Sequence, residues 1–234
     1  MMLKVNTIYP AFMGECNKFG IGARCVFIRL SGCNLRCYTK TLGTPCDTPE
    51  ALSFSSGKEM SELEILQEVH KYNSKYICLT GGEPLCQDVT DLLRELGKEF
   101  FYTIVETNGS KAIKDYRYFR NVSFVVDYKS PSSGETDKMV LDNLNHLDRN
   151  DWVKFVLYDN VDYDDMRRVV ERFCGRINVA VGLYWGSTLS YKELSENILR
   201  HQLKVTLNFQ AHKMMVLYDK HREELKNLVI PRTI

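Results

Sequence analysis

The chain has 234 residues, of which 44% are hydrophobic and 26% are charged; this is ordinary globular usage and excludes an intrinsically disordered chain. A formal net charge of +1 gives no indication of a basic surface that would bind nucleic acid. Residues 1–9 lack a basic region followed by an apolar run, and no stretch approaches about 18 consecutive apolar residues. The sequence therefore predicts neither a signal peptide nor a membrane span.

The eight cysteines indicate metal binding rather than a disulfide framework. Disulfide scaffolds are usually shorter and rich in loops, and a chain without a secretion signal is expected in the reducing cytoplasm. Clustered thiols in that compartment more often bind metal or carry out chemistry than form bridges. The scattered Cys25, Cys78 and Cys174 lie in or beside apolar runs and are predicted to be small core residues.

Short β-type runs alternate with helical patterns along the chain. The first strand is predicted over residues 25–30, and a capping box at Ser61 and Glu64 begins the first amphipathic helix. A second capping box, at Ser190 and Glu193, begins a helix over residues 191–201. Further strands are predicted at residues 76–79, 102–105, 123–127, 152–157, 177–181 and 204–209, and further helices at residues 89–100, 163–173 and 220–226.

This alternation predicts βαβ units with right-handed crossovers and a mostly parallel sheet. About six units fit the length, too few for a full eight-unit barrel, so a partial barrel or an open curved sheet is expected. No linker is visible, which predicts a single domain over residues 1–234. Ligands of parallel α/β sheets bind at the carboxyl ends of the strands. Polar or glycine-rich segments follow four predicted strands there, at residues 32–33, 80–84, 106–109 and 127–130.

Three cysteines, Cys33, Cys37 and Cys46, lie within 14 residues in the loop after the first predicted strand. Thiolates are soft ligands that suit iron–sulfur clusters and zinc. The loop offers no fourth cysteine and no histidine. A structural zinc site requires four protein ligands, whereas three cysteines on a four-iron cubane leave one iron open for a substrate. The pattern therefore favours a catalytic cluster, and Cys86 is predicted to be a packed thiol rather than a fourth ligand.

A three-cysteine loop after the first strand, followed by Gly-Gly-Glu-Pro at residues 81–84, resembles the radical S-adenosylmethionine (SAM) superfamily. The usual superfamily spacing is Cys-x3-Cys-x2-Cys. Here eight residues separate Cys37 from Cys46, so the loop carries a six-residue insertion. Pro45 stands where the superfamily usually has an aromatic residue.

Two more specific motifs resemble the 7-carboxy-7-deazaguanine synthase family within that superfamily. They are Cys-Asp-Thr at residues 46–48 and Asp-Tyr-Lys-Ser-Pro-Ser-Ser-Gly at residues 127–134. The resemblance runs through nearly the whole chain and also includes residues 13–15, 27–35, 80–85, 106–109 and 210–213. It implies a partial (βα)6-type radical SAM barrel with a mostly parallel curved sheet, a variant cluster loop at residues 33–48 and a C-terminal extension after about residue 213.

The resemblance also implies an activity and its cofactors. Members convert 6-carboxy-5,6,7,8-tetrahydropterin to 7-carboxy-7-deazaguanine with release of ammonia, which supplies 7-deazapurines such as queuosine precursors. The expected cofactors are a 4Fe-4S cluster, SAM and Mg2+. The expected partners are the pterin, an electron donor such as flavodoxin or ferredoxin, and a second copy of the chain in a homodimer.

The family's motifs, matched to this sequence residue by residue, imply a set of candidate site residues. Cys33, Cys37 and Cys46 would hold the cluster, and the hydroxyl of Thr48 would bind Mg2+. The implied SAM contacts are Pro45, Cys46, Asp47, Gly82, Glu83, Glu106, Asn108, Ser130, Pro131 and Ser132. The implied substrate contacts are Phe12, Met13, Gly14, Arg29, Thr80 and His212.

The residue types are consistent with these roles, but each has a structural alternative. Gly81 and Gly82 would let the backbone approach the methionine end of SAM, and Glu83 would accept a hydrogen bond from its ammonium group. The alternative is a strand-end turn in which Pro84 begins a helix. The serines at residues 130–132 would offer hydroxyls to a carboxylate or form a plain turn. Glu106 and Asn108 would hold the ribose or order their loop.

Arg29 lies in an otherwise apolar strand, where a charge is costly unless it is paired. It would clasp a carboxylate in a bidentate manner, or it would face outward. Thr48 is otherwise a loop residue or a helix cap before Pro49. His212 has either a direct role or a structural one.

Two other functions remain open from the sequence. One is another radical SAM enzyme, such as an activase of a glycyl-radical enzyme, which would need a protein-sized groove and no Mg2+. The other is a non-enzymatic zinc-binding module, which would hold zinc without sulfide.

Overall fold

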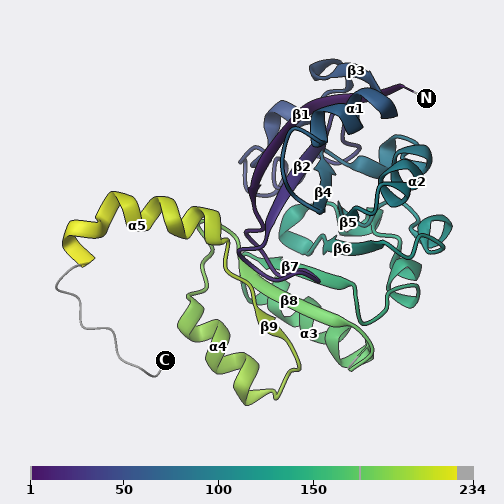
Figure 1. Cartoon of the computed structure of the whole chain (residues 1–234). Coiled ribbons are helices and arrows are strands. Elements are labelled where there is room, and N and C mark those ends of the chain that lie inside the picture. Colours follow the sequence, from purple (N-terminus) through teal and green to yellow (C-terminus); the bar gives the residue numbers. More distant parts are fainter. Residues whose placement is uncertain (1, 174, 226–234) are drawn as a thin grey trace.

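The computed structural model describes residues 2–173 and 175–225 of the chain (Figure 1). Cys174, predicted to be a core residue, lies outside these residues, as does the end of the helix predicted at residues 220–226. Within the described part, nine strands form one sheet in the order β3-β1-β2-β4-β5-β6-β7-β8-β9. None of the helices described has the length and apolar character required to cross a membrane.

The sheet is mostly parallel, as the alternation of strands and helices predicts. Every neighbouring pair from β2 to β9 is parallel, whereas β1 pairs antiparallel with both β2 and β3. The strands are β1 (Met2–Phe12), β2 (Arg24–Leu30), β3 (Lys58–Ser61), β4 (Tyr76–Gly81), β5 (Tyr102–Thr107), β6 (Val122–Tyr128), β7 (Trp152–Leu157), β8 (Asn178–Leu183) and β9 (Thr206–Leu207).

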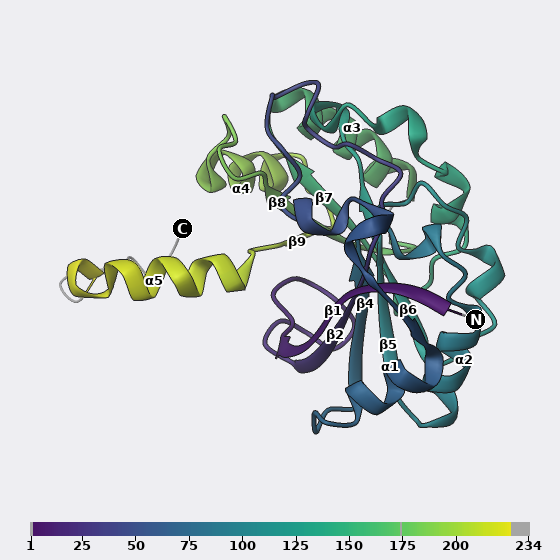
Figure 2. The ribbon, with the colours of Figure 1, turned by 90° about the horizontal axis from the view of Figure 1, so that it is seen from above.

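The sheet curves into an open, partial barrel with the helices on its outer side (Figures 1 and 2). These helices are α1 (Glu62–Val69), α2 (Thr90–Lys98), α3 (Asn160–Phe173) and α4 (Tyr191–Arg200). The predicted capping boxes at Ser61 and Ser190 are both present and begin α1 and α4. Buried leucines of α2, including Leu92 and Leu96, belong to the apolar core shared by the sheet and the helices.

Two crossovers contain only short 3-10 turns in place of α-helices. The β5–β6 connection holds Lys114–Tyr116, and the β6–β7 connection holds Pro131–Ser133, Thr136–Lys138 and Leu141–Asn145. These connections are rich in serine, threonine, aspartate and asparagine, whose side chains compete for backbone hydrogen bonds and favour turns. The helical layer is therefore thin over β6, and the turn after β6 meets the cysteine loop.

A second, smaller cluster of buried residues lies apart from the main core. Met13, Cys25, Cys78, Ile104 and Val125 form it. Val125 also lines the cavity described below, so this cluster supports that cavity. The prediction that Cys25 and Cys78 are core residues is confirmed, because both side chains are fully buried.

Helix α5 (Ala211–Leu225) projects from the body of the molecule in both views (Figures 1 and 2). The sequence predicted a helix only from residue 220, so α5 begins nine residues earlier than expected. Its apolar side chains Met215, Val216 and Tyr218 are exposed, which gives the helix no continuous buried stripe of the kind that identifies a helix from sequence.

Candidate active site

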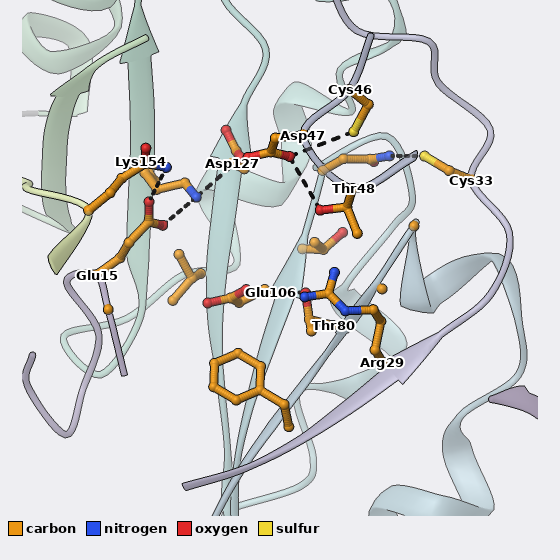
Figure 3. A pocket seen from close by; sticks show the side chains of 18 of the residues that line it. Glu15, Arg29, Cys33, Cys46, Asp47, Thr48, Thr80, Glu106, Asp127 and Lys154 are labelled. Atoms are coloured by element: carbon orange, nitrogen blue, oxygen red, sulfur yellow. Dashed lines mark hydrogen bonds and ion pairs between the residues drawn. The ribbon is translucent and has the colours of Figure 1, made fainter. Parts of the chain in front are cut away.

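A cavity of about 420 Å³ opens at the carboxyl ends of the parallel strands (Figure 3). A second cavity of about 620 Å³ adjoins it and shares several lining residues, among them Cys46, Asp47 and Lys129. Most of the predicted site residues line the first cavity; these are Phe12, Gly14, Arg29, Cys33, Cys46, Asp47, Thr48, Thr80, Gly82, Glu106, Asn108 and His212. Cys37 lines the second. The predicted Met13, Pro45, Glu83, Ser130, Pro131 and Ser132 line neither.

The three predicted cluster cysteines border these two cavities, and all three thiols are partly exposed. Figure 3 shows Cys33 and Cys46 at the same end of the first cavity. Burial raises the pKa of each thiol, that of Cys37 to about 11, while the ammonium group of Lys129 acts on all three in the opposite direction. A buried cation therefore favours the thiolate form that iron requires.

The donor set fits an iron–sulfur cluster better than a single metal ion. Among residues 2–173 and 175–225, no three histidine, cysteine, aspartate or glutamate side chains converge closely enough to hold one ion. Structural zinc needs such convergence, whereas the cysteine ligands of a cubane bind different irons and stand farther apart.

Hydrogen bonds hold the lengthened cysteine loop against two neighbouring loops. Tyr38 N donates to Ser133 O over 2.8 Å, in the turn after β6. Thr44 Oγ1 lies 2.8 Å from Tyr184 OH, in the loop after β8, and the rings of Tyr38 and Tyr184 pack with centroids 4.4 Å apart. The inserted residues therefore form an ordered bridge that fixes Cys37 and Cys46 at its two ends.

The Gly-Gly-Glu-Pro segment has a structural role that the sequence did not reveal. A Cβ atom on Gly82 would lie 2.4 Å from Gly32 O and 2.6 Å from Ala51 O, so neighbouring backbone leaves no room for a side chain. Glu83 is completely buried, and its carboxylate accepts hydrogen bonds from the backbone N–H of Leu85 and Asn108. The Glu83 carboxylate thus already has protein donors, and its contact with the SAM ammonium group stays a prediction.

Two predicted SAM contacts in the turn after β6, Ser130 and Ser132, differ in their hydrogen bonding. Ser130 Oγ is buried and has no hydrogen-bond partner, which is unusual for a hydroxyl and marks a donor available to a ligand or a water molecule. Ser132, by contrast, is already bound: its backbone N–H donates to Asp162 Oδ1 over 2.8 Å, and its hydroxyl donates to Asp162 Oδ2. Ser130 lines neither cavity, so its contact with SAM stays a prediction, whereas Ser132 holds the turn in place.

A charged network missed by the sequence analysis lines the same cavity (Figure 3). Lys154 Nζ lies 2.6 Å from Glu15 Oε2 and 3.3 Å from Asp127 Oδ2, and Lys129 Nζ lies 3.1 Å from the same Asp127 oxygen. Gln210 donates to the other oxygen of Glu15 over 3.0 Å. One signal was available: Lys154 is the single charged residue of the otherwise apolar β7, as Arg29 is of the strand predicted over residues 25–30.

Asp127 and Glu106, two partly buried carboxyl groups of the cavity, have opposite electrostatic environments. Burial alone would raise the pKa of Asp127, but Lys129 and Lys154 outweigh it, so the pKa is lowered. Burial raises the pKa of Glu106, and the partial compensation by Lys154 is opposed by Glu15. Asp127 is therefore held as an anion, whereas Glu106 holds its proton more tightly than an ordinary glutamate.

The predicted substrate contacts gather around Arg29. Its side chain faces the cavity near Thr80 and Glu106 (Figure 3), so the alternative that it faces outward is wrong. Thr80 Oγ1 donates to Glu106 Oε2 over 3.2 Å. Met13 is buried, and its backbone groups pair with those of Gly22 and Ala23, so it contributes to the cavity wall only from behind.

His212 and Gly14 meet where α5 begins. Ala211 N donates to Gly14 O over 2.8 Å, and the His212 ring packs against Gly14. Burial lowers the pKa of His212 from its ordinary value of 6.5, so the imidazole is neutral at pH 7. The C-terminal helix thus starts at the edge of the cavity.

Thr48 lines the cavity, and its hydroxyl donates to Asp47 Oδ1 over 3.3 Å. It precedes the 3-10 turn Pro49–Ala51, but its side chain makes no capping hydrogen bond to that turn. Thr48 therefore occupies the cap position of this turn but does not cap it through its side chain, and its hydroxyl lies beside the Asp47 carboxylate instead.

Comparisons with known proteins agree with this arrangement. Residues 19–139 match the family described as a 4Fe-4S single cluster domain. The chain is 34% identical to the 7-carboxy-7-deazaguanine synthase of Leptospira interrogans, over 89% of this chain and 93% of the relative. It is 32% identical to the synthase of Clostridium acetobutylicum, over 92% and 96%.

The fold is similar to the crystal structure of QueE from Escherichia coli, with a TM-score of 0.69 and 19% identity over 88% of this chain and 94% of that one. This likeness confirms the predicted α/β fold with a mostly parallel sheet. The sequence identities and the matched family model show that the chain belongs to the 7-carboxy-7-deazaguanine synthase family of radical SAM enzymes.

Proposed function

We propose that this chain converts 6-carboxy-5,6,7,8-tetrahydropterin to 7-carboxy-7-deazaguanine with release of ammonia, in the synthesis of queuosine precursors. The observation that carries the proposal is the cavity itself, which joins the cysteine loop to Arg29 at the carboxyl ends of the strands. The full-length relatives favour the synthase over the activase that the sequence left open.

Cys33, Cys37 and Cys46 would hold the cluster, and Lys129 would stabilise their thiolates. When bound, the cluster and SAM supply the one-electron chemistry that begins the reaction. Asp47, Gly82, Asn108 and Glu106 border the cavity and the buried Ser130 hydroxyl lies free, so we assign the SAM site to these residues.

The pterin would occupy the part of the cavity next to Arg29, whose guanidinium suits a bidentate contact with the substrate carboxylate. Phe12, Gly14, Thr80 and His212 surround this space. Burial would exclude water from the reacting ring, and the fixed charges of the cavity would orient it.

We assign Mg2+ to the hydroxyl oxygen of Thr48, because a hard cation beside a substrate carboxylate prefers oxygen ligands. The test is the stimulation of product formation by added Mg2+ after removal of divalent ions. Thr48→Val should abolish most of this stimulation, whereas Thr206→Val, an exposed change on β9, should leave it intact. Equal stimulation in the wild-type chain and Thr48→Val would reject Thr48 as a ligand.

The family also suggests two partners, which we propose for this chain. An external one-electron donor such as flavodoxin or ferredoxin would reduce the cluster, and two copies of the chain would form a homodimer. Sedimentation of the reconstituted protein tests the dimer, since a single species of monomer mass at micromolar concentration would reject it.

The proposed activity is tested by anaerobic reconstitution, incubation with SAM, a reductant and the pterin, and mass spectrometry of the products. We expect 7-carboxy-7-deazaguanine and ammonia in equal amounts. Cleavage of SAM without any deazaguanine would show that the protein is a radical SAM enzyme for a different substrate.

A further inference from the structure

The sulfur of Cys33 accepts two hydrogen bonds from the protein. Leu35 N donates over 3.4 Å, and the side-chain amide of Asn108 donates from Nδ2 over 3.7 Å. Figure 3 shows the second contact as the dashed line that ends on Cys33. Asn108 directly follows β5, so this bond links the ends of two different strands at the edge of the cavity.

The orientation of the Asn108 amide is fixed by its other contacts. Its Oδ1 accepts from Ser110 N over 2.9 Å and from Ser110 Oγ over 2.6 Å, so Nδ2 is the end that faces Cys33. The same Nδ2 donates to Asn34 Oδ1 over 3.3 Å. Only 8% of Asn108 is exposed, and a buried amide with a settled orientation keeps its donor directed at the sulfur.

Glu83 fixes the backbone of Asn108. Its Oε2 accepts from Asn108 N over 2.6 Å, while its Oε1 accepts from Thr107 Oγ1 over 2.8 Å and from Leu85 N over 3.0 Å. Because the Glu83 side chain is completely buried, this carboxylate binds the loop after β5 to the loop after β4 without contacting solvent.

Hydrogen bonds to cysteine sulfur stabilise the more negative, reduced form of an iron–sulfur cluster and so raise its reduction potential. We propose that Asn108, positioned by Glu83, raises the reduction potential of the cluster by donating its amide N–H to the Cys33 thiolate. The step affected is the uptake of one electron from an external donor protein, with no bond made or broken. The inference rests on the proposed cluster and gives Asn108 a role beyond its place in the proposed SAM site.

The test is the midpoint potential of the reconstituted cluster, followed by electron paramagnetic resonance during an anaerobic redox titration. Asn108→Ala removes the donor and should make the potential more negative, whereas Asn145→Ala, an exposed asparagine on another loop, should leave it unchanged. Glu83→Gln loosens Asn108 but also removes a negative charge that acts on Cys33, so it is compared in the wild-type and Asn108→Ala backgrounds. The charge effect is common to both backgrounds, so Glu83→Gln should give a more negative shift in the wild-type background than in Asn108→Ala, because Glu83 acts through Asn108.

An unchanged or more positive potential in Asn108→Ala would overturn the proposal. The midpoint does not depend on the fraction of chains that carry a cluster, so a poorly loaded variant still gives an answer. If Asn108→Ala holds no cluster, Asn108→Leu, which keeps the size of the side chain without the donor, decides, and an unchanged potential in that variant would also overturn the proposal. Failure of the proposed synthase activity would be distinguishable, since it would leave a titratable cluster whose potential still responds to Asn108.

Discussion

The phenol oxygen of Tyr9 accepts a hydrogen bond from Nη2 of Arg29 over 3.1 Å, across the antiparallel pair of β1 and β2. The Tyr9 ring is held in turn by Phe27, its direct partner in the register, with ring centroids 5.3 Å apart and planes within 7°. The stacked pair restricts the phenol, and the phenol restricts the guanidinium. Arg29 is therefore oriented before any carboxylate arrives.

Tyr9→Phe keeps the ring and removes this restriction. A hydrogen bond to a charged group contributes about 1.5–3 kcal/mol, and each 1.4 kcal/mol corresponds to roughly tenfold in affinity. We expect the KM for the pterin to rise roughly tenfold with little change in kcat, measured by steady-state kinetics. Tyr218→Phe, on the exposed face of α5, is the matched control and should change neither constant. A fall in kcat at constant KM would contradict the positioning role.

Replacing Lys154 by methionine should destabilise the protein strongly. Its ammonium group bridges Glu15 and Asp127, and the Lys154 and Glu15 side chains are only 12% and 13% exposed. Removing one partner of a buried ion pair typically costs about 3–5 kcal/mol, because the other charges lose their partner. Chemical denaturation of the cluster-free protein measures this loss.

Two comparisons make the Lys154 result specific. Lys192→Met, on the exposed side of α4, should change the free energy of unfolding by less than about 0.5 kcal/mol. The double variant Lys154→Met with Glu15→Gln should be more stable than Lys154→Met alone. The second substitution removes the Glu15 charge that the loss of Lys154 leaves unpaired. A double variant as unstable as the sum of the two single variants would show that the residues do not act as a pair.

Glu106 should make the folded state less stable as the pH rises. Burial raises its folded pKa above the ordinary 4.5, so between these two values the folded chain binds more protons than the unfolded chain. The free energy of unfolding therefore falls with increasing pH in the window that begins at 4.5. Glu106→Gln removes the titration, and its stability relative to the wild-type chain should increase as the pH rises from 4.5 to 7.5. A difference in the free energy of unfolding between Glu106→Gln and the wild-type chain that stays constant across this pH range would refute the raised pKa.

Gly14→Ala should destabilise the start of α5. The added Cβ would lie 2.5 Å from Nδ1 of His212, and overpacking of this kind typically costs about 1–3 kcal/mol. In a His212→Ala background the obstructing ring is absent, so the same change should cost much less. The free energies of the two single variants and the double variant, from chemical denaturation, give the coupling. If Gly14→Ala lowers the free energy of unfolding equally in both backgrounds, the His212 ring is not what the added methyl group meets.

Most of the fold could be predicted because its strands have a strong local signal. β7 was predicted with its observed bounds, and both capping boxes begin helices where the sequence placed them. β1 was missed, because its Pro10 and mixed burial hide the alternation that marks a strand, and its pairing with β2 is what orders it. Tertiary pairing of this kind leaves little trace in one sequence.

The site was predictable where a residue type is chemically unusual in its setting. The three cysteines and Arg29 stand out in this way, and all four line the two joined cavities. Glu83 was located in the right loop, but its contacts to Asn108 and Thr107 depend on which loops meet. The pairing of Glu15 with Lys154 joins residues 139 positions apart, and only the folded chain brings them together.

The central claim, that three thiolates hold one cluster, is tested most directly by iron and sulfide analysis of anaerobically reconstituted cysteine variants. The wild-type chain should bind four iron and four sulfide ions, as its match to a 4Fe-4S single cluster domain indicates. Cys46→Ala should lose nearly all of both. Cys86→Ala should keep both ions, because the Cys86 thiol donates a hydrogen bond to Asn34 and is not one of the three proposed ligands. Full iron content in Cys46→Ala, or its loss in Cys86→Ala, would contradict the assignment of the ligands.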